Sequence, residues 1–277
     1  MSRSTMAYGT WPSPITAAML TSTTPAMRDL GLWNDAICWV ESRPQERGRF
    51  VLVMRTDDGT VDLTPTAFSV RNRVHEYGGA AWTPAGEAVV FSNFEDNRLY
   101  RIDGPGRTPE PITPEGSWRY ADLQWDSETD RLYAVREDHS DSSQEAVNTL
   151  VVLAADGPND DGGRVIASGT NFVSSPRLSP DGRHLSWLTW NHPAMPWDET
   201  LLWIGEIVAD GSLVNARPVA GGPGESVILQ DWDRDGLLVY VSDQTGWWNL
   251  YRTDGETVTA LTSAQVEYGV PLWNFGV

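Results

Sequence analysis

Lysine is missing from this 277-residue sequence, and all 20 of its basic residues are arginine. The absence excludes a Walker-type phosphate lysine, a Schiff-base lysine and a Ser-Lys catalytic dyad. Basic residues are also few beside 38 Asp and Glu, which leaves a net charge of −18 at pH 7. Because nucleic acids and anionic membranes are bound through basic surface, we expect neither as a partner.

Cysteine is nearly absent as well, because Cys38 stands alone in an apolar stretch. A single cysteine cannot form an internal disulfide, and we expect a buried structural thiol rather than a reactive one. No run approaches the roughly 18 apolar residues of a membrane helix, and residues 1–8 lack the apolar core of a signal peptide. The default prediction is a cytoplasmic protein.

The sequence also lacks the parts of an α/β-hydrolase. No serine stands in the Gly-x-Ser-x-Gly pattern of a nucleophile elbow, and no long amphipathic helix is visible. Without helices, an α/β layer has nothing to be built from. We therefore expect this chain to be inactive as a hydrolase by itself.

What the sequence does contain is a repeated pattern of an apolar entry, a tight turn and alternating apolar residues. The clearest copy spans residues 178–190, where Pro180, Asp181 and Gly182 supply the turn. Looser copies begin near Trp33, Trp82, Trp125 and Trp232. A period of roughly 40 to 50 residues with several short strands is typical of propeller blades rather than of a sandwich.

The repeats predict an all-β fold, a β-propeller of four-stranded antiparallel blades. Five blades are predicted, over about residues 28–65, 79–114, 119–169, 174–222 and 227–263. Residues 264–277 look like the first strand of a sixth blade. An innermost strand without partners leaves an unpaired edge, so we expect the chain to be cut from a longer propeller.

Residues 1–27 are predicted to form an extended arm. Its prolines, Pro12 and Pro14, stand too close together for a helix at that point. We expect the arm to lie against the body through Tyr8, Trp11 and Ile15.

The position of each loop within its blade, which we call loop parity, predicts that one face of the propeller is the functional one. In an antiparallel four-stranded blade, the link between the second and third strands and the link to the next blade emerge on the same side. Unusual links of these kinds occur at residues 75–77, 93–97, 118–120, 137–148, 191–200 and 243–248. This face carries nearly all the links with an unusual polar and aromatic composition. The glycine pair Gly78 and Gly79 predicts that the backbone passes close to another part of the structure, such as the crowded propeller axis.

Four motifs, in this order, carry a family resemblance: Tyr-Gly-Thr-Trp-Pro-Ser-Pro-Ile at 8–15, Arg-Val-His-Glu-Tyr-Gly-Gly at 73–79, Arg-Glu-Asp-His at 136–139, and Trp-Asn-His-Pro-Ala-Met-Pro-Trp-Asp at 190–198. With them the chain resembles the N-terminal β-propeller of prolyl oligopeptidase-family serine peptidases. The branch it resembles is that of bacterial acylaminoacyl-peptidases and dipeptidyl-aminopeptidases. The resemblance covers essentially the whole sequence, and the 190–198 motif is its most specific part.

The resemblance implies a truncated seven-bladed propeller that gates and orients short peptides. In that family the propeller caps an α/β-hydrolase domain of the same polypeptide, which carries the catalytic Ser, Asp and His. That domain and the last blades are absent from these 277 residues. The implied partners are therefore the hydrolase domain and short peptides.

The resemblance also suggests how a substrate is held. Related exopeptidases receive the positively charged N-terminus on propeller carboxylates, and Glu76 and Glu137 are the candidates here, because a desolvated ammonium needs an anionic partner. A purely structural role stays open: Glu76 bonding backbone across blades, and Glu137 pairing with Arg136. The full set predicted to bind substrate, with no catalytic residue, is Glu76, Glu137, His192, Trp197, Asp198, His75, Tyr77 and Arg136.

No metal or other cofactor is expected. The histidines His75, His139 and His192 stand among carboxylates, but no two have helical i, i+4 spacing and no cysteine joins them. The oxygen-rich run 156–163 lacks the alternating ligand spacing of a calcium loop, which favours a solvated turn. The tryptophans that could line an apolar pocket are Trp190, Trp197, Trp247 and Trp248, although tryptophans in a propeller mostly pack between blades.

Two other functions remain open at this point. The chain could be a self-standing propeller that binds protein or carbohydrate. It could also be a propeller enzyme acting alone, such as a metal-dependent lyase or lactonase. The latter needs a ring of carboxylate and histidine ligands at the axis, which the sequence does not let us assemble.

Overall fold

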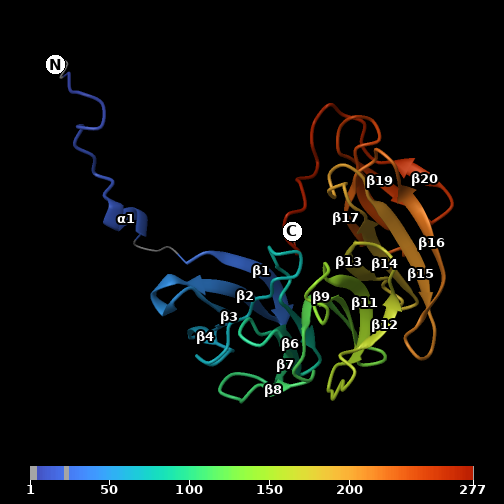
Figure 1. Ribbon diagram of the computed structural model, residues 1–277, viewed down its shortest axis with the longest axis horizontal. Coiled ribbons are helices and arrows are strands. Elements are labelled where there is room, and N and C mark those ends of the chain that lie inside the picture. Colours follow the sequence, from blue (N-terminus) through green and yellow to red (C-terminus); the bar gives the residue numbers. More distant parts are fainter. Residues whose placement is uncertain (1–4, 22–24, 277) are drawn as a thin grey trace.

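The computed structural model describes residues 5–21 and 25–276, and over these residues it is almost entirely β-structure. Five four-stranded antiparallel sheets follow one another along the chain, and within each sheet neighbouring strands are consecutive in sequence. Figure 1 shows the sheets side by side in an arc, from the blue β1 to the red β20. The predicted all-β propeller of four-stranded blades is confirmed.

The strands of the five blades have the following bounds. The first blade contains β1 (Met27–Trp33), β2 (Ala36–Arg43), β3 (Arg49–Thr56) and β4 (Gly59–Asp62). The second contains β5 (Trp82–Ala85), β6 (Ala88–Ser92), β7 (Leu99–Ile102) and β8 (Glu110–Pro111). The third contains β9 (Trp118–Asp126), β10 (Arg131–Asp138), β11 (Val147–Ala154) and β12 (Arg164–Ala167). The fourth contains β13 (Phe172–Leu178), β14 (His184–Trp190), β15 (Leu201–Ile207) and β16 (Leu213–Gly221). The fifth contains β17 (Val227–Trp232), β18 (Leu238–Ser242), β19 (Asn249–Thr253) and β20 (Val258–Ala260).

The turn between β13 and β14 forms as its residue types predict. Gly182 has a φ of 66° and donates its N–H to the Ser179 carbonyl at 2.9 Å. The Asp181 carboxylate accepts the Ser179 hydroxyl at 2.6 Å and the Arg183 N–H at 3.1 Å. These hydrogen bonds all lie within the turn, so its geometry follows from its own residues.

The core lies between successive blades rather than at one centre. Separate clusters of buried apolar side chains join each blade to the next. Tryptophans add hydrogen bonds across these interfaces, because Trp33 donates to the Gly86 carbonyl at 3.1 Å and Trp232 to the Arg177 carbonyl at 3.0 Å. Cys38 is fully buried in the first cluster, as predicted for a structural thiol.

A left-handed residue recurs in the innermost strand of every blade, or in the segment that enters it. The φ values are between 42° and 54°, and four of these positions coincide with register shifts in the sheet. The residues are Asp29, Ala80, Asp122, Ser175 and Leu229. The repeat of this irregularity indicates a feature of blade geometry rather than a local accident.

The N-terminal arm does not lie against the blades. Tyr8 is fully exposed, and Trp11 and Ile15 are more than half exposed, because the segment runs away from the body (Figure 1). The predicted packing through these three side chains is therefore wrong. The arm holds the short helix α1 (Ala17–Thr21), and neither it nor the 3-10 turn η1 (Pro44–Glu46) is long enough to cross a membrane.

The segment after β20 also differs from the prediction. Through Gly276 it forms no strand beyond one isolated parallel bridge between Gly79 and Phe275. The Phe275 N–H donates to the Gly78 carbonyl at 3.0 Å, and the Phe275 side chain is buried. A strand needs a neighbour along its length, whereas the backbone contacts of this segment are scattered: Tyr268 N–H donates to the Trp248 carbonyl at 2.8 Å, and Phe275 bridges to Gly79. It therefore turns back to the middle of the arc (Figure 1) instead of starting a blade.

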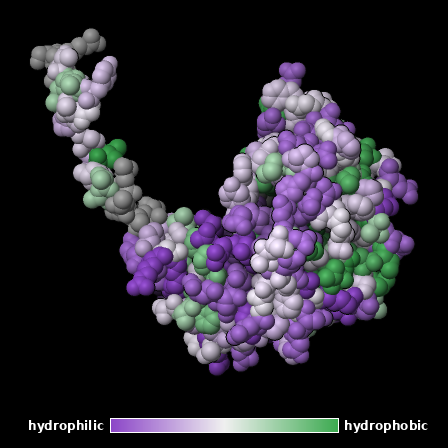
Figure 2. Space-filling model, in the orientation of Figure 1, coloured by the Kyte–Doolittle hydropathy of each residue, from purple (hydrophilic) through white to green (hydrophobic). Residues whose placement is uncertain are grey.

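The surface matches the composition. The face seen in Figure 2 is mostly hydrophilic, with smaller hydrophobic patches. This agrees with the net charge of −18, which keeps a surface well hydrated.

Candidate functional site

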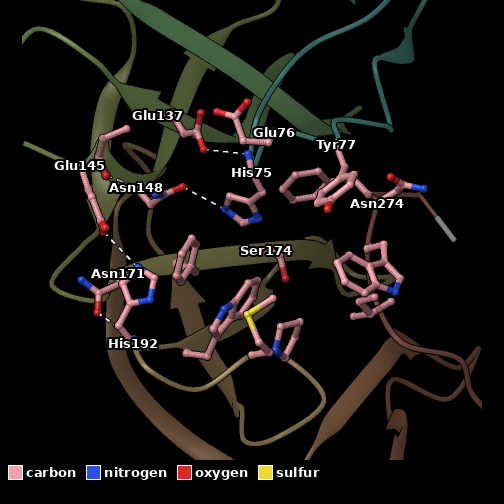
Figure 3. A pocket seen from close by; sticks show the side chains of 18 of the residues that line it. His75, Glu76, Tyr77, Glu137, Glu145, Asn148, Asn171, Ser174, His192 and Asn274 are labelled. Carbon is pink, nitrogen blue, oxygen red and sulfur yellow. Dashed lines mark hydrogen bonds and ion pairs between the residues drawn. The ribbon is translucent and has the colours of Figure 1, made fainter. Parts of the chain in front are cut away.

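A cavity of about 610 Å³ opens where links from several blades meet. Its walls come from the link between the first two blades, the β10–β11 and β14–β15 links, the start of β13 and the last residues of the chain. Figure 3 shows Glu76 and Glu137 beside the His75 ring, with Glu145 and His192 on one side and Tyr77 on the other. Three of the links that loop parity assigned to one face thus converge on one space.

The walls of the cavity are largely aromatic. Phe172 and Trp190 stack with ring centroids 5.2 Å apart and an interplanar angle of 12°. The ring centroid of Trp273 lies 4.5 Å from that of Trp197 and 5.3 Å from that of Tyr77. Such walls suit a flat aromatic or long apolar group. The exposed Trp247 and its neighbour Trp248 do not line the cavity.

Glu137, at the end of β10, is held on both carboxylate oxygens. Its side chain is only 6% exposed. Oε1 accepts the His75 backbone N–H at 2.7 Å, and Oε2 lies 3.0 Å from Nε2 of His139. Nη1 of Arg119 is 3.7 Å from Oε2. The alternative in which Glu137 pairs with Arg136 is wrong, because its partners are these other groups.

Glu76 is the opposite case. Its side chain is 81% exposed, and the contact of its carboxylate within the described chain is an ion pair with Arg119 at 3.6 Å. The alternative in which this side chain bonds backbone of another blade is therefore not what the structure has. An exposed carboxylate on the rim of an aromatic cavity can receive a ligand cation.

A second exposed carboxylate, Glu145, lines the same cavity as Glu76. Its Oε2 is 3.0 Å from Nε2 of His192, and both side chains are well exposed. The His192 ring packs edge-on against Phe172 at 4.9 Å. Sequence reasoning missed Glu145 because it belongs to no recognised motif, although the 137–148 link that contains it was singled out.

The His75 ring lines the cavity and is partly buried. Its ring packs against Phe172, Trp190 and Phe275 at 4.8 to 5.4 Å. Nε2 lies 3.0 Å from Oδ1 of Asn148, and this oxygen makes Nε2 the donor. Burial lowers the pKa of the His75 imidazole, against the weaker opposing effects of Glu137 and Asn148.

Two of the predicted substrate-binding residues lie outside the cavity. Asp198 is exposed and accepts the Met195 N–H at 2.9 Å, so it stabilises its own turn. Arg136 donates to the carbonyls of Gly162 and Gly163 at 3.2 and 3.0 Å. Neighbouring residues of a strand face opposite sides of the sheet, so Arg136 and Glu137 do not share the site.

The glycine pair makes the close approach that its sequence predicted. A Cβ on Gly78 would stand 2.3 Å from the Asn72 carbonyl oxygen, and one on Gly79 would stand 2.3 Å from that of Phe275. Both glycines also have positive φ, 70° and 110°. The neighbour of Gly79 is thus the last part of the chain, which closes one side of the cavity.

The polar side chains Asn159 and Asp161 of the oxygen-rich run 156–163 form hydrogen bonds with nearby backbone. The Asn159 amide group bonds the Ile112 carbonyl and the Ala154 backbone, and Asp161 accepts the Gly163 N–H at 3.0 Å. Across residues 5–21 and 25–276, no group of three or more His, Cys, Asp or Glu is placed to hold a metal ion.

The fold and the cavity together define the class of this protein, a β-propeller with an aromatic, carboxylate-rimmed pocket on one face. No protein-family model and no curated protein sequence matches the chain. Among solved structures, it is 34% identical to a puromycin-hydrolyzing peptidase of Mycobacterium tuberculosis and 36% identical to a puromycin hydrolase, with a TM-score of 0.90 for each. Each comparison covers 99% of this chain and 44% of the other. A prolyl endopeptidase matches at 15% identity with a TM-score of 0.62, over 87% of this chain and 37% of the endopeptidase, and shows the fold alone.

The chain belongs to the prolyl oligopeptidase family and corresponds to its N-terminal propeller. It spans less than half the length of the two puromycin hydrolases.

Proposed function

We propose that this propeller gates and orients short substrates that carry a free amino group next to an aromatic side chain. It would do so for an α/β-hydrolase domain of the same polypeptide, which would supply the serine nucleophile. The observation that carries the proposal is that stacked aromatic walls and the exposed carboxylate of Glu76 share one cavity.

The cavity suits such a ligand in size and charge. Its volume of about 610 Å³ falls within the range of small-molecule sites. The carboxylates Glu76, Glu137 and Glu145 line it, and Arg119 approaches two of them. A cationic amine would therefore enter a net negative rim, where opposite charge favours its protonated form.

Puromycin, which the two similar hydrolases are named for, matches this description chemically. It is an amide of an aromatic amino acid whose α-amino group is free. The aromatic group would lie among Trp190, Trp197 and Trp273, while the ammonium would meet Glu76. The identity of 34% and 36% to those hydrolases supports the same substrate class here.

Isothermal titration calorimetry of this chain with puromycin and with N-acetylpuromycin tests the proposal. We expect the free amine to bind about tenfold tighter, a difference of about 1.4 kcal/mol, which lies between an exposed and a desolvated ion pair. Glu76→Gln should remove that preference, whereas the charge-matched control Glu87→Gln, in the β5–β6 turn, should keep it. Equal binding of both compounds would contradict the proposal and favour a self-standing module for other ligands.

A further inference from the structure

The turn that carries Glu76 has an unusual backbone. His75 and Glu76 are consecutive residues with positive φ, 51° and 66°. Residues with a Cβ occupy this left-handed region at a cost, so two in succession persist only where the surroundings hold them. Hydrogen bonds within the turn are part of that support, because Glu76 N–H donates to Arg73 and Gly78 N–H to Val74, both at 3.0 Å.

The His75 N–H is held by a different part of the chain. It donates to Oε1 of Glu137 at 2.7 Å, and the two residues are 62 apart in sequence. Glu137 stands on the third blade, whereas the turn links the first blade to the second. One buried carboxylate thus fixes the strained turn to another blade.

The carboxylates of Glu137 and Glu76 therefore differ in how far their oxygens are free to bind a ligand. One carboxylate oxygen of Glu137 accepts the His75 backbone N–H, and the other lies within hydrogen-bond distance of Nε2 of His139. Within residues 5–21 and 25–276, the one contact of the Glu76 carboxylate is its ion pair with Arg119 at 3.6 Å. Arg119 lies 3.6 and 3.7 Å from the two carboxylates, which offsets the repulsion between them.

We infer that Glu137 is a positioning residue, and that its reach to the His75 N–H, rather than its negative charge, is what the amine site needs. It holds the 75–77 turn so that the carboxylate of Glu76 is presented at the cavity rim. This inference rests on the proposed function, because it assumes that Glu76 receives a ligand ammonium.

Two substitutions at one position separate reach from charge. Glu137→Gln keeps a carbonyl oxygen at the same distance from the backbone but removes the charge. Glu137→Asp keeps the charge but is one methylene too short to reach the His75 N–H. The readout is the ratio of the dissociation constants of N-acetylpuromycin and puromycin, measured by calorimetry on the whole chain. A role confined to folding would shift the melting temperature without moving this ratio.

We expect Glu137→Gln to stay within about twofold of the wild-type ratio and Glu137→Asp to lower it by about fivefold or more. A loss in Glu137→Gln, alone or in both variants, would overturn the inference, because the charge would then be in use. An unchanged ratio in both variants would also overturn it, because neither reach nor charge would matter. If the wild-type chain shows no preference, or Glu76→Gln keeps it, the proposed function itself fails, which is a different result.

Discussion

At the scale of single residues, His75 shows how burial sets a charge state at the site. Its ring is enclosed by Phe172, Trp190 and Phe275, and its pKa is lowered chiefly because the charged form loses its hydration. The nearby Glu137 and the bond to Asn148 oppose this effect without overcoming it. The lowered pKa leaves the His75 imidazole neutral at pH 7, so this ring adds no positive charge to the cavity wall.

Burial of His75 predicts a loss of stability in mild acid. An unfolded histidine has a pKa of about 6.5. Below that pH, His75 binds a proton in the unfolded state but not in the folded state. The free energy of unfolding therefore falls as the pH falls, by at most about 1.4 kcal/mol per pH unit. Urea unfolding at pH 7.5 and 5.5 should show His75→Gln losing about 1 kcal/mol less than the wild type. Identical pH dependence in the two proteins would show that His75 is not the group responsible.

At the scale of elements, the left-handed residue that recurs in or just before the innermost strands makes a prediction through Ser175. Its φ is 54°, where a side chain costs about 1 to 2 kcal/mol and glycine costs almost none. Ser175→Gly should therefore leave stability unchanged or raise it by about 1 kcal/mol, since added chain entropy offsets part of the gain. The matched control is Ser174→Gly, at a neighbouring buried position without positive φ, which should destabilise. Chemical denaturation checks both, and equal destabilisation would contradict a strained bulge at Ser175.

The blades themselves could be predicted because their signals are local. The turn at Asp181 and Gly182, the glycine pair at 78 and 79, and the buried Cys38 each follow from residue types within a few positions. The side of β10 on which Arg136 lies also follows from strand alternation, which places it opposite Glu137. Applied strictly, that rule would have removed Arg136 from the candidate site.

The course of the last residues could not be predicted from local pattern. Residues 264–276 alternate like a strand, but a strand forms only where a partner is available. The structure instead buries Phe275 and adds Trp273 to the cavity wall. Glu145 was missed for a related reason, because only the folded blades bring it into the same cavity as Glu76.

At the scale of the whole molecule, the first blade leaves an apolar face uncovered. Leu30, Leu32 and Ile37 are between 49% and 77% exposed, and Leu32 pairs directly with Ile37 across β1 and β2. Contiguous exposed apolar surface of this kind drives association. We expect the chain to self-associate with rising concentration in sedimentation velocity. Leu32→Glu should shift it toward monomer, whereas Thr60→Glu, which adds the same charge on β4, should not. A single monomeric species at all concentrations would contradict this expectation.

The measurement that tests the account most directly is a crystal structure of this chain with bound puromycin. The account predicts the ammonium in hydrogen-bond contact with Glu76, the aromatic group between the walls formed by Trp190, Trp197 and Trp273, and Glu137 still bonded to the His75 N–H. Puromycin bound elsewhere on the propeller, or in the cavity with its amine turned away from Glu76, would contradict it.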